Sequence, residues 1–253
     1  MEPRVVGLRK MAKKKVSDEP EITGLVDKQP EEFLESGIPE IDELIGGIPR
    51  RRITELWGAE NAGKTYTASK IMAQVSQKYK VLYIDSEFAL NKDRIDKLGA
   101  NMENIDFVAD ARLERVCELM INSIDKYDLI ILDSLAHLTP LTVDTAEVGE
   151  NAIGLFSRLI KHWVVKFRPR LGVSKTAFIA VNQYRKPFGL YAKAESPGGT
   201  SWHHATDVRL LLTSNSSDKV VSGGKQTGQN INLEVKKSKV STPHTHTKFK
   251  LEY

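Results

Sequence analysis

Short apolar runs alternate with amphipathic segments along most of the chain. Between the runs, apolar residues recur at helical spacing over 113–124 and 152–167, and a further helix is predicted around Pro39, where a Gly-Gly pair ends an apolar face. This alternation predicts an α/β fold with a mostly parallel central sheet flanked by helices. The continuous apolar runs, typical of strands buried on both faces, are residues 53–57, 81–85, 105–108, 129–133, 177–182 and 208–213.

The first 35 residues differ from the rest of the chain. They lack hydrophobic periodicity and are rich in Lys, Glu, Asp and Pro, a composition that cannot bury enough apolar surface to fold. We therefore expect a flexible basic arm over residues 1–35, which is a candidate oligomerisation segment. Residues 36–253 are expected to form one folded core, since a chain of this length suits a single α/β domain.

Composition narrows the class of protein. No apolar run approaches the roughly 18 to 20 residues of a membrane span, and the N-terminus has no apolar segment followed by a small-residue cleavage site. The single cysteine, Cys117, falls in the apolar stripe of its predicted helix, so we expect it to pack in the core. These features predict a cytoplasmic protein with no membrane partner. The net charge of +4 permits nucleic-acid binding but does not require it.

The segment GAENAGKT, at residues 58–65, matches the phosphate-binding pattern GxxxxGK followed by Ser or Thr. It lies between a predicted strand and a predicted helix, where backbone N–H groups and the positive end of the helix dipole favour phosphates. We expect Lys64 to reach the β- and γ-phosphate oxygens and Thr65 to ligate Mg²⁺. The predicted nucleotide-binding residues are Gly58, Ala59, Glu60, Asn61, Ala62, Gly63, Lys64, Thr65 and Tyr66.

Carboxylates follow two other predicted strands. Asp133 ends the run 129–133 and is the candidate second Mg²⁺ ligand. Glu87 follows the run 81–85 and is the candidate general base for the attacking water, with Asp85 as the alternative. Because the carboxyl ends of parallel strands share one sheet edge, we expect these groups near the phosphate loop.

The order of several segments resembles that of the RecA-type recombinases, particularly compact phage or archaeal-like versions. The resemblance runs from about residue 36 to residue 253, and it implies a P-loop ATPase core with C-terminal antiparallel strands and with ATP and Mg²⁺ as cofactors. Because the chain ends at Tyr253, we expect it to lack the C-terminal domain of the bacterial members. The matching segments are SGIPEIDELIGGIPRRRITELWG, GAENAGKT, YIDSEFAL, LIILDSLAHLTP, VGENAIGLFSRLI, AVNQYR, SPGG and VKKSKVSTP.

The resemblance also implies roles for individual residues. Glu87 matches the catalytic carboxylate and Gln183 the sensor of the γ-phosphate. Arg94 departs from the family pattern, because it stands where bacterial members often stack a tyrosine on adenine. Lys237 and Lys239 match two lysines that reach the ATP of a neighbouring subunit, and their spacing along a strand places them on one face. The implied DNA-binding residues, beside loops at 142–154 and 185–199, are Arg158, Arg185, Gly198 and Gly199.

The function that the resemblance implies is that of a DNA-dependent ATPase and recombinase. Such a protein forms filaments on single-stranded DNA and pairs that strand with homologous double-stranded DNA, so its partners include DNA and further copies of itself, in a helical filament or a ring. One alternative is a hexameric helicase with the same core, which the lysine pair disfavours. The other is a recombination mediator or single-strand annealing protein that binds ATP as an assembly signal, which the presence of both Glu87 and Gln183 disfavours.

Overall fold

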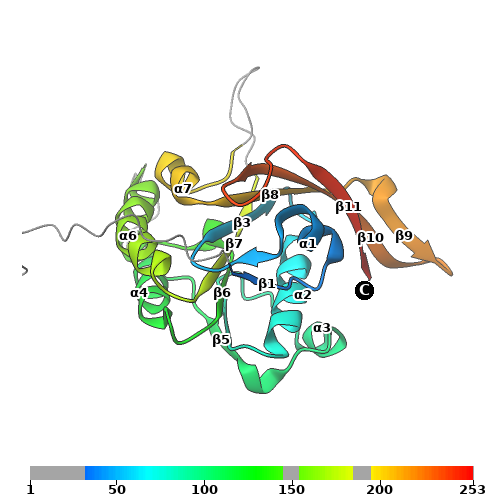
Figure 1. Ribbon diagram of the computed structural model, residues 1–253, viewed down its shortest axis with the longest axis horizontal. Helices are drawn as coiled ribbons and strands as arrows, with labels where there is room; N and C mark the ends of the chain where they lie inside the picture. Colours follow the sequence, from blue (N-terminus) through cyan, green and yellow to red (C-terminus); the bar gives the residue numbers. More distant parts are fainter. Residues whose placement is uncertain (1–31, 145–153, 185–194, 253) are drawn as a thin grey trace, which may run out of the picture. The chain divides into compact units, whose positions relative to one another are not determined.

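One mixed sheet runs through the computed structural model, which describes residues 32–144, 154–184 and 195–252 (Figure 1). Its strand order is β11-β10-β8-β3-β7-β6-β4-β5, and β9 pairs with β10. The strands from β8 to β5 in this order are parallel, whereas β10 and β11 are antiparallel. The strands are β3 (Ile53–Gly58), β4 (Val81–Asp85), β5 (Ile105–Ala109), β6 (Leu129–Asp133), β7 (Ala177–Gln183), β8 (Val208–Thr213), β9 (Lys219–Ser222), β10 (Lys225–Ser238) and β11 (His246–Glu252).

The predicted fold class is confirmed. The six predicted strands are the six parallel strands, each within one residue of its predicted bounds. Upstream, β1 (Phe33–Leu34) pairs with β2 (Ile48–Pro49) in a separate small sheet, so the described chain has regular structure slightly before residue 36. Of the arm expected over residues 1–35, residues 1–31 lie outside the described residues.

Helices cover both faces of the sheet. Among the described residues, no helix is long and apolar enough to cross a membrane. The predicted helices around residues 39, 64, 113 and 155 are present, and the fourth continues past Pro169, where Leu171 is still buried. The helices are α1 (Pro39–Ile45), α2 (Lys64–Ser76), α3 (Lys92–Lys97), α4 (Leu113–Ser123), α5 (Leu141–Asp144), α6 (Leu155–Gly172) and α7 (Gly199–Ala205).

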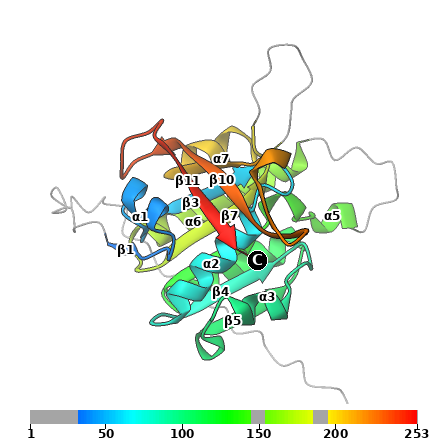
Figure 2. The same cartoon turned by 90° about the vertical axis from the view of Figure 1, so that its right-hand side faces the viewer.

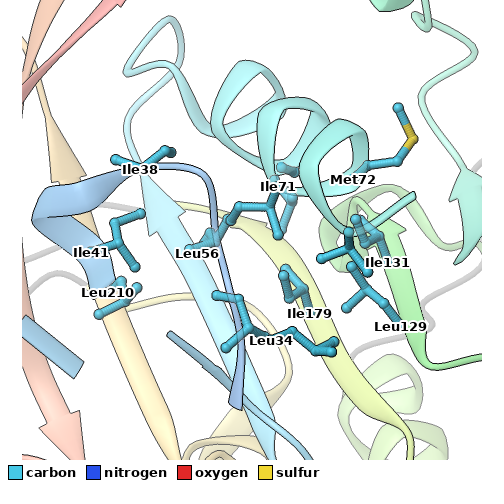
Figure 3. Packing of buried hydrophobic residues seen from close by; sticks show 14 of the residues in the cluster. Leu34, Ile38, Ile41, Leu56, Ile71, Met72, Leu129, Ile131, Ile179 and Leu210 are labelled. Carbon is cyan, nitrogen blue, oxygen red and sulfur yellow. The ribbon is translucent and has the colours of Figure 1, made fainter. Parts of the chain in front are cut away.

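Two hydrophobic cores lie on opposite faces of the sheet. Strand side chains alternate between them, so Leu129 and Ile131 of β6 lie in the core that also holds residues of α1 and α2 (Figure 3), whereas Ile130 and Leu132 lie in the core with residues of α4, α6 and α7. Cys117 lies in the second core, as predicted, and burial raises the pKa of its thiol to about 12. This two-sided burial explains why the parallel strands read as continuous apolar runs.

Strands β10 and β11, which face the viewer in Figure 2, extend the sheet beyond β8 and pack against the turn between β3 and α2. Ile231 of β10 and Leu251 of β11 contact that turn at Gly63. In addition, the Gln229 side chain of β10 donates to the Asn61 carbonyl at 3.2 Å. The C-terminal strands therefore support the segment in which the phosphate-binding pattern lies.

Candidate functional site

The phosphate loop connects β3 to α2 and depends on close backbone packing. A side chain at Gly58 would lie 2.2 Å from the Leu212 carbonyl oxygen of the neighbouring strand β8. Gly63 has φ +79°, and a Cβ atom there would come within 2.7 Å of Leu251 and 2.8 Å of Ile231. Glycine fits both positions because it has no Cβ, and at Gly63 it also adopts positive φ without strain. The loop thus ends at the N-terminus of α2, which has the dipole polarity that favours an anion.

Lys64 opens α2 and is the buried cation of the site. Its Nζ donates to the carbonyl oxygen of Ala59 at 2.7 Å, so the side chain folds back along the loop. Burial lowers the pKa of Lys64, while the nearby carboxylates of Glu87, Asp133 and Glu60 raise it. A phosphate group beside Nζ would further favour the charged ammonium, which suits the predicted contact with ATP.

Asp133 ends β6 and is only 3% exposed. Its Oδ2 accepts a hydrogen bond from the Tyr83 hydroxyl at 2.7 Å, whereas Oδ1 has no hydrogen-bond partner among the described residues. Burial raises the pKa of Asp133 to about 6, and the nearby hydroxyl groups of Tyr83 and Thr65 oppose that rise. A buried, unpaired carboxylate oxygen next to the Thr65 hydroxyl fits an oxygen-seeking Mg²⁺ ion.

Glu87 and Asp85 follow β4 but have different surroundings. Both oxygens of Asp85 accept backbone N–H groups, from Glu87 at 3.0 Å and from Leu90 at 2.9 Å, so Asp85 shapes the turn after the strand. Glu87 instead accepts a hydrogen bond from the Ser134 hydroxyl at 2.7 Å, beside Asp133. The geometry therefore supports Glu87 over Asp85 as the candidate base.

Gln183 ends β7 and is aligned with Gly58 in the parallel pairing of β7 with β3. Its Nε2 lies 3.4 Å from Nδ1 of His137, and the same imidazole nitrogen lies 2.8 Å from Oε1 of Glu87. The structure thus brings Glu87 and Gln183 to the same imidazole nitrogen. Sequence reasoning missed His137, and the signal that could have found it is a histidine in the turn directly after the Asp133 strand.

A second feature missed from the sequence is the buried carboxylate of Glu55 in β3. Its Oε1 accepts hydrogen bonds from Asn182 Nδ2 at 2.8 Å, Ser196 Oγ at 2.7 Å and Trp202 Nε1 at 2.7 Å, and Oε2 accepts from Arg209 Nε at 2.6 Å. Glu55 is 0% exposed, so these donors replace its hydration. The carboxylate joins the phosphate-loop strand to residues on both sides of segment 185–194.

The predicted lysine pair lies near the C-terminal end of α7. Lys237 Nζ donates to the carbonyl oxygens of His203 at 2.7 Å and His204 at 3.2 Å. A cation is favourable there, because the C-terminal end of a helix carries partial negative charge. Lys239 follows β10 and pairs with the buried Asp207 at 3.1 Å. Burial lowers the pKa of Lys237, and the charge of nearby Lys239 lowers it further. Their reach towards a neighbouring subunit stays a prediction.

The predicted DNA-binding residues lie at two helix starts. Arg158 is exposed in the first turns of α6, and Gly198 and Gly199 begin α7 with φ values of +116° and +73°. Arg185 lies outside the described residues. The structure therefore locates three of the four predicted residues without testing their contact with DNA.

Arg94 and Tyr66 meet beside the phosphate loop. The guanidinium carbon of Arg94, on α3, lies 6.0 Å from the centre of the Tyr66 ring, at the outer limit of a cation–π contact. The Tyr66 hydroxyl also donates to the Glu252 carbonyl, which connects α2 to β11. That this pair contacts the nucleotide base stays a prediction.

The site lies on the parallel part of the sheet, with a phosphate loop after β3 and with acidic side chains at the ends of β6 and β4. This arrangement defines a P-loop nucleotide-binding core. Residues 23–253 match the family model described as the RecA N-terminal domain. The chain belongs to the RecA family, which confirms the resemblance found in its sequence.

Several curated relatives are similar over most of this chain. Protein RecA of Aquifex aeolicus is 34% identical over 217 residues, which are 83% of this chain and 61% of the relative. Protein RecA of Aquifex pyrophilus is 33% identical over the same coverage, and that of Thermus thermophilus is 31% identical over 239 residues, 91% of this chain and 69% of the relative. The chain therefore spans about 61% of the length of the first two relatives.

Proposed function

We propose that the chain is the DNA-dependent ATPase core of a homologous recombinase, which assembles on single-stranded DNA when ATP and Mg²⁺ are bound. The observation that carries the proposal is the convergence of Lys64, Asp133 and Glu87 at one sheet edge in a chain of the RecA family. The pKa of Lys64 responds to both carboxylates, so the three groups lie within electrostatic reach of one another.

In the proposed site, each group has one task. The backbone of the phosphate loop and Lys64 hold the β- and γ-phosphates, and Thr65 and Asp133 would hold Mg²⁺. When bound, Mg²⁺ supplies positive charge that neutralises the phosphate oxygens. Gln183 contacts the γ-phosphate and so reports its presence to the segment that follows β7.

Hydrolysis requires a water molecule to attack the γ-phosphorus atom. Glu87 accepts a proton from that water while the bond between the γ-phosphorus and the bridging oxygen of ADP breaks. The products are ADP and inorganic phosphate. Loss of the γ-phosphate then removes the partner of Gln183, so hydrolysis reverses the ATP-bound arrangement.

In the proposed assembly, Lys237 and Lys239 supply positive charge to the ATP of the next subunit. Arg158, Arg185, Gly198 and Gly199 contact or shape the DNA site. Base pairing between DNA strands reads the sequence, so the protein needs contacts with the DNA backbone rather than with particular bases.

Electron microscopy tests this function. The chain is incubated with single-stranded DNA, Mg²⁺ and a non-hydrolysable ATP analogue, with Lys64→Ala as the matched control. Helical filaments that require the analogue, and that the control does not form, are expected. Closed rings would favour the hexameric helicase, and failure of the chain to assemble on DNA would favour a mediator that only binds ATP.

A further inference from the structure

His137 lies where the ends of three strands meet. It closes the three-ten turn after β6, and its Nδ1 lies 2.8 Å from Oε1 of Glu87, which follows β4. The same nitrogen is 2.9 Å from Ser134 Oγ and 3.4 Å from Nε2 of Gln183, the last residue of β7. One imidazole nitrogen therefore contacts the candidate base and the candidate phosphate sensor.

The chemistry of these contacts determines which ring nitrogen of His137 carries a proton. An ionised carboxylate only accepts hydrogen bonds, so a lone pair on Nδ1 at 2.8 Å from Glu87 would place two acceptors against each other. Nδ1 must therefore carry a proton, which lies between Oε1 at 2.8 Å and the Ser134 hydroxyl oxygen at 2.9 Å, while Oε1 also accepts from Ser134. Two polar neighbours at one oxygen hold the carboxylate in a single orientation, and they leave the other oxygen, Oε2, as the one that would accept a proton from the attacking water.

The same proton keeps Gln183 apart from the imidazole. The Nε2 group of Gln183 is a donor, and a protonated Nδ1 is also a donor, so they do not form a hydrogen bond at 3.4 Å. Gln183 therefore loses no bond to His137 when its amide turns towards a γ-phosphate. His137 thus holds the Glu87 carboxylate in one orientation and leaves the Gln183 side chain able to move.

We propose that His137 is a positioning residue for ATP hydrolysis, which orients the Glu87 carboxylate through Nδ1–H and separates it from Gln183. This inference rests on the proposed function, because it requires Glu87 to act as the base. His137 is partly exposed, with 43% of its side chain accessible, so its replacement is expected to leave the fold intact.

Steady-state ATP hydrolysis with single-stranded DNA tests the role. His137→Ala is expected to lower kcat by about 10- to 100-fold, because Glu87 loses its fixed orientation, while the KM for ATP changes by less than about twofold. His137→Asn places an amide N–H near the position of Nδ1 and is expected to restore kcat to within about threefold of wild type. The matched control is His246→Ala, an exposed histidine of β11, which is expected to match wild type.

Two results of this assay would overturn the role: wild-type kcat in His137→Ala, or equally slow Ala and Asn variants. A second measurement does not need hydrolysis. Nitrogen-15 NMR of the imidazole, with the signal assigned by its loss in His137→Asn, is expected to show a protonated Nδ1 that loses this character in Glu87→Ala, which removes the acceptor. An unprotonated Nδ1 in wild type would overturn the inference. If wild type does not hydrolyse ATP but the NMR result holds, the proposed function fails while the contact with Glu87 stands.

Discussion

Lys64 contributes the buried positive charge of the phosphate loop, and its removal provides the first prediction. Lys64→Ala is expected to abolish ATP binding or turnover, with a loss on the order of 3 kcal/mol or more of transition-state stabilisation. Calorimetric titration with ATP and a hydrolysis assay measure the two effects. Lys78→Ala, an exposed lysine just after the same helix, is the control. Hydrolysis near the wild-type rate in Lys64→Ala would show that the phosphates bind elsewhere.

Glu87 is the candidate base, and a second prediction separates this role from a structural one. Glu87→Gln keeps the size of the side chain and an oxygen that accepts from Ser134, but it cannot take a proton from water. We expect retained binding of ATP and DNA, with hydrolysis slower by roughly 10² to 10⁴. Filter binding and a phosphate-release assay check the two parts. Lost ATP binding would indicate that Glu87 builds the site instead.

Asp133 provides a prediction about pH. Burial raises its pKa in the folded protein to about 6, from 3.8 as the ordinary value, so the folded state binds more protons than the unfolded state between these pH values. The stabilisation from this group is full below about pH 4 and is lost as the pH rises through about 6. The rise in the pKa of Asp133 from 3.8 to about 6 corresponds to about 3 kcal/mol of unfolding free energy.

Asp133→Asn removes this titration without changing the size of the side chain. Urea unfolding without Mg²⁺ at several pH values gives the difference in unfolding free energy between wild type and variant. We expect wild type to lose about 3 kcal/mol relative to Asp133→Asn from pH 4 to pH 7. Parallel pH curves for the two proteins would contradict the raised pKa.

Residues of the site could be predicted from the sequence where their pattern is local. The phosphate loop has its own spacing, and Asp133 and Glu87 each follow an apolar run, so both were identified. The position of His137 just after the Asp133 strand marks it as a candidate, but the contacts of His137 and Glu55 could not be identified in this way. Their contacts depend on which strands are neighbours in the sheet, and strand order is not encoded in any single segment.

At the scale of elements, Glu55 connects β3 to β7, β8 and α7. Glu55→Gln is expected to destabilise the fold by about 3 kcal/mol or more, because Arg209 and the other donors would surround a neutral amide instead of a charge. Urea unfolding measures the change. Glu234→Gln, which removes a partly exposed pair with Lys236, is the control, and its expected cost is below about 1 kcal/mol. Equal effects of the two substitutions would contradict the importance of the buried network.

The helices and strands could be predicted from the sequence more readily where more of their residues are buried. The parallel strands are covered on both faces and therefore read as continuous apolar runs. Helix α3 buries only Ile95, and α7 is short and buries only Trp202, so neither has a helical apolar stripe to detect. The C-terminal antiparallel strands were expected from the family resemblance alone, since most residues at the start of β10 are exposed.

At the scale of the whole molecule, the lysine pair predicts a site shared between subunits. Replacing Lys237 and Lys239 with alanine is expected to leave ATP binding by one chain nearly unchanged, because Lys64, Thr65 and Asp133 remain. DNA-stimulated hydrolysis is expected to be lost. Lys236→Ala, in the same strand, is the control, and thermal melting checks that the loss of the contacts with α7 and Asp207 does not unfold the protein.

Mixing two inactive proteins tests whether this site is shared. The double lysine variant has an intact phosphate loop, and Lys64→Ala protein has an intact lysine pair, so an interface between them rebuilds one complete site. Partial recovery of DNA-stimulated hydrolysis is expected. No recovery, despite co-assembly shown by pull-down, would mean that the lysines act within their own subunit, where they contact α7 and Asp207.

The central claim is that ATP hydrolysis by this RecA-family core depends on DNA. The most direct test is the rate of ATP hydrolysis by the purified chain at saturating Mg²⁺, with and without single-stranded DNA, and with Glu87→Gln protein measured in parallel to exclude a contaminating ATPase. The account predicts that DNA raises the wild-type rate and leaves the variant inactive. A wild-type rate that is the same with and without DNA, or a variant as active as wild type, would contradict it.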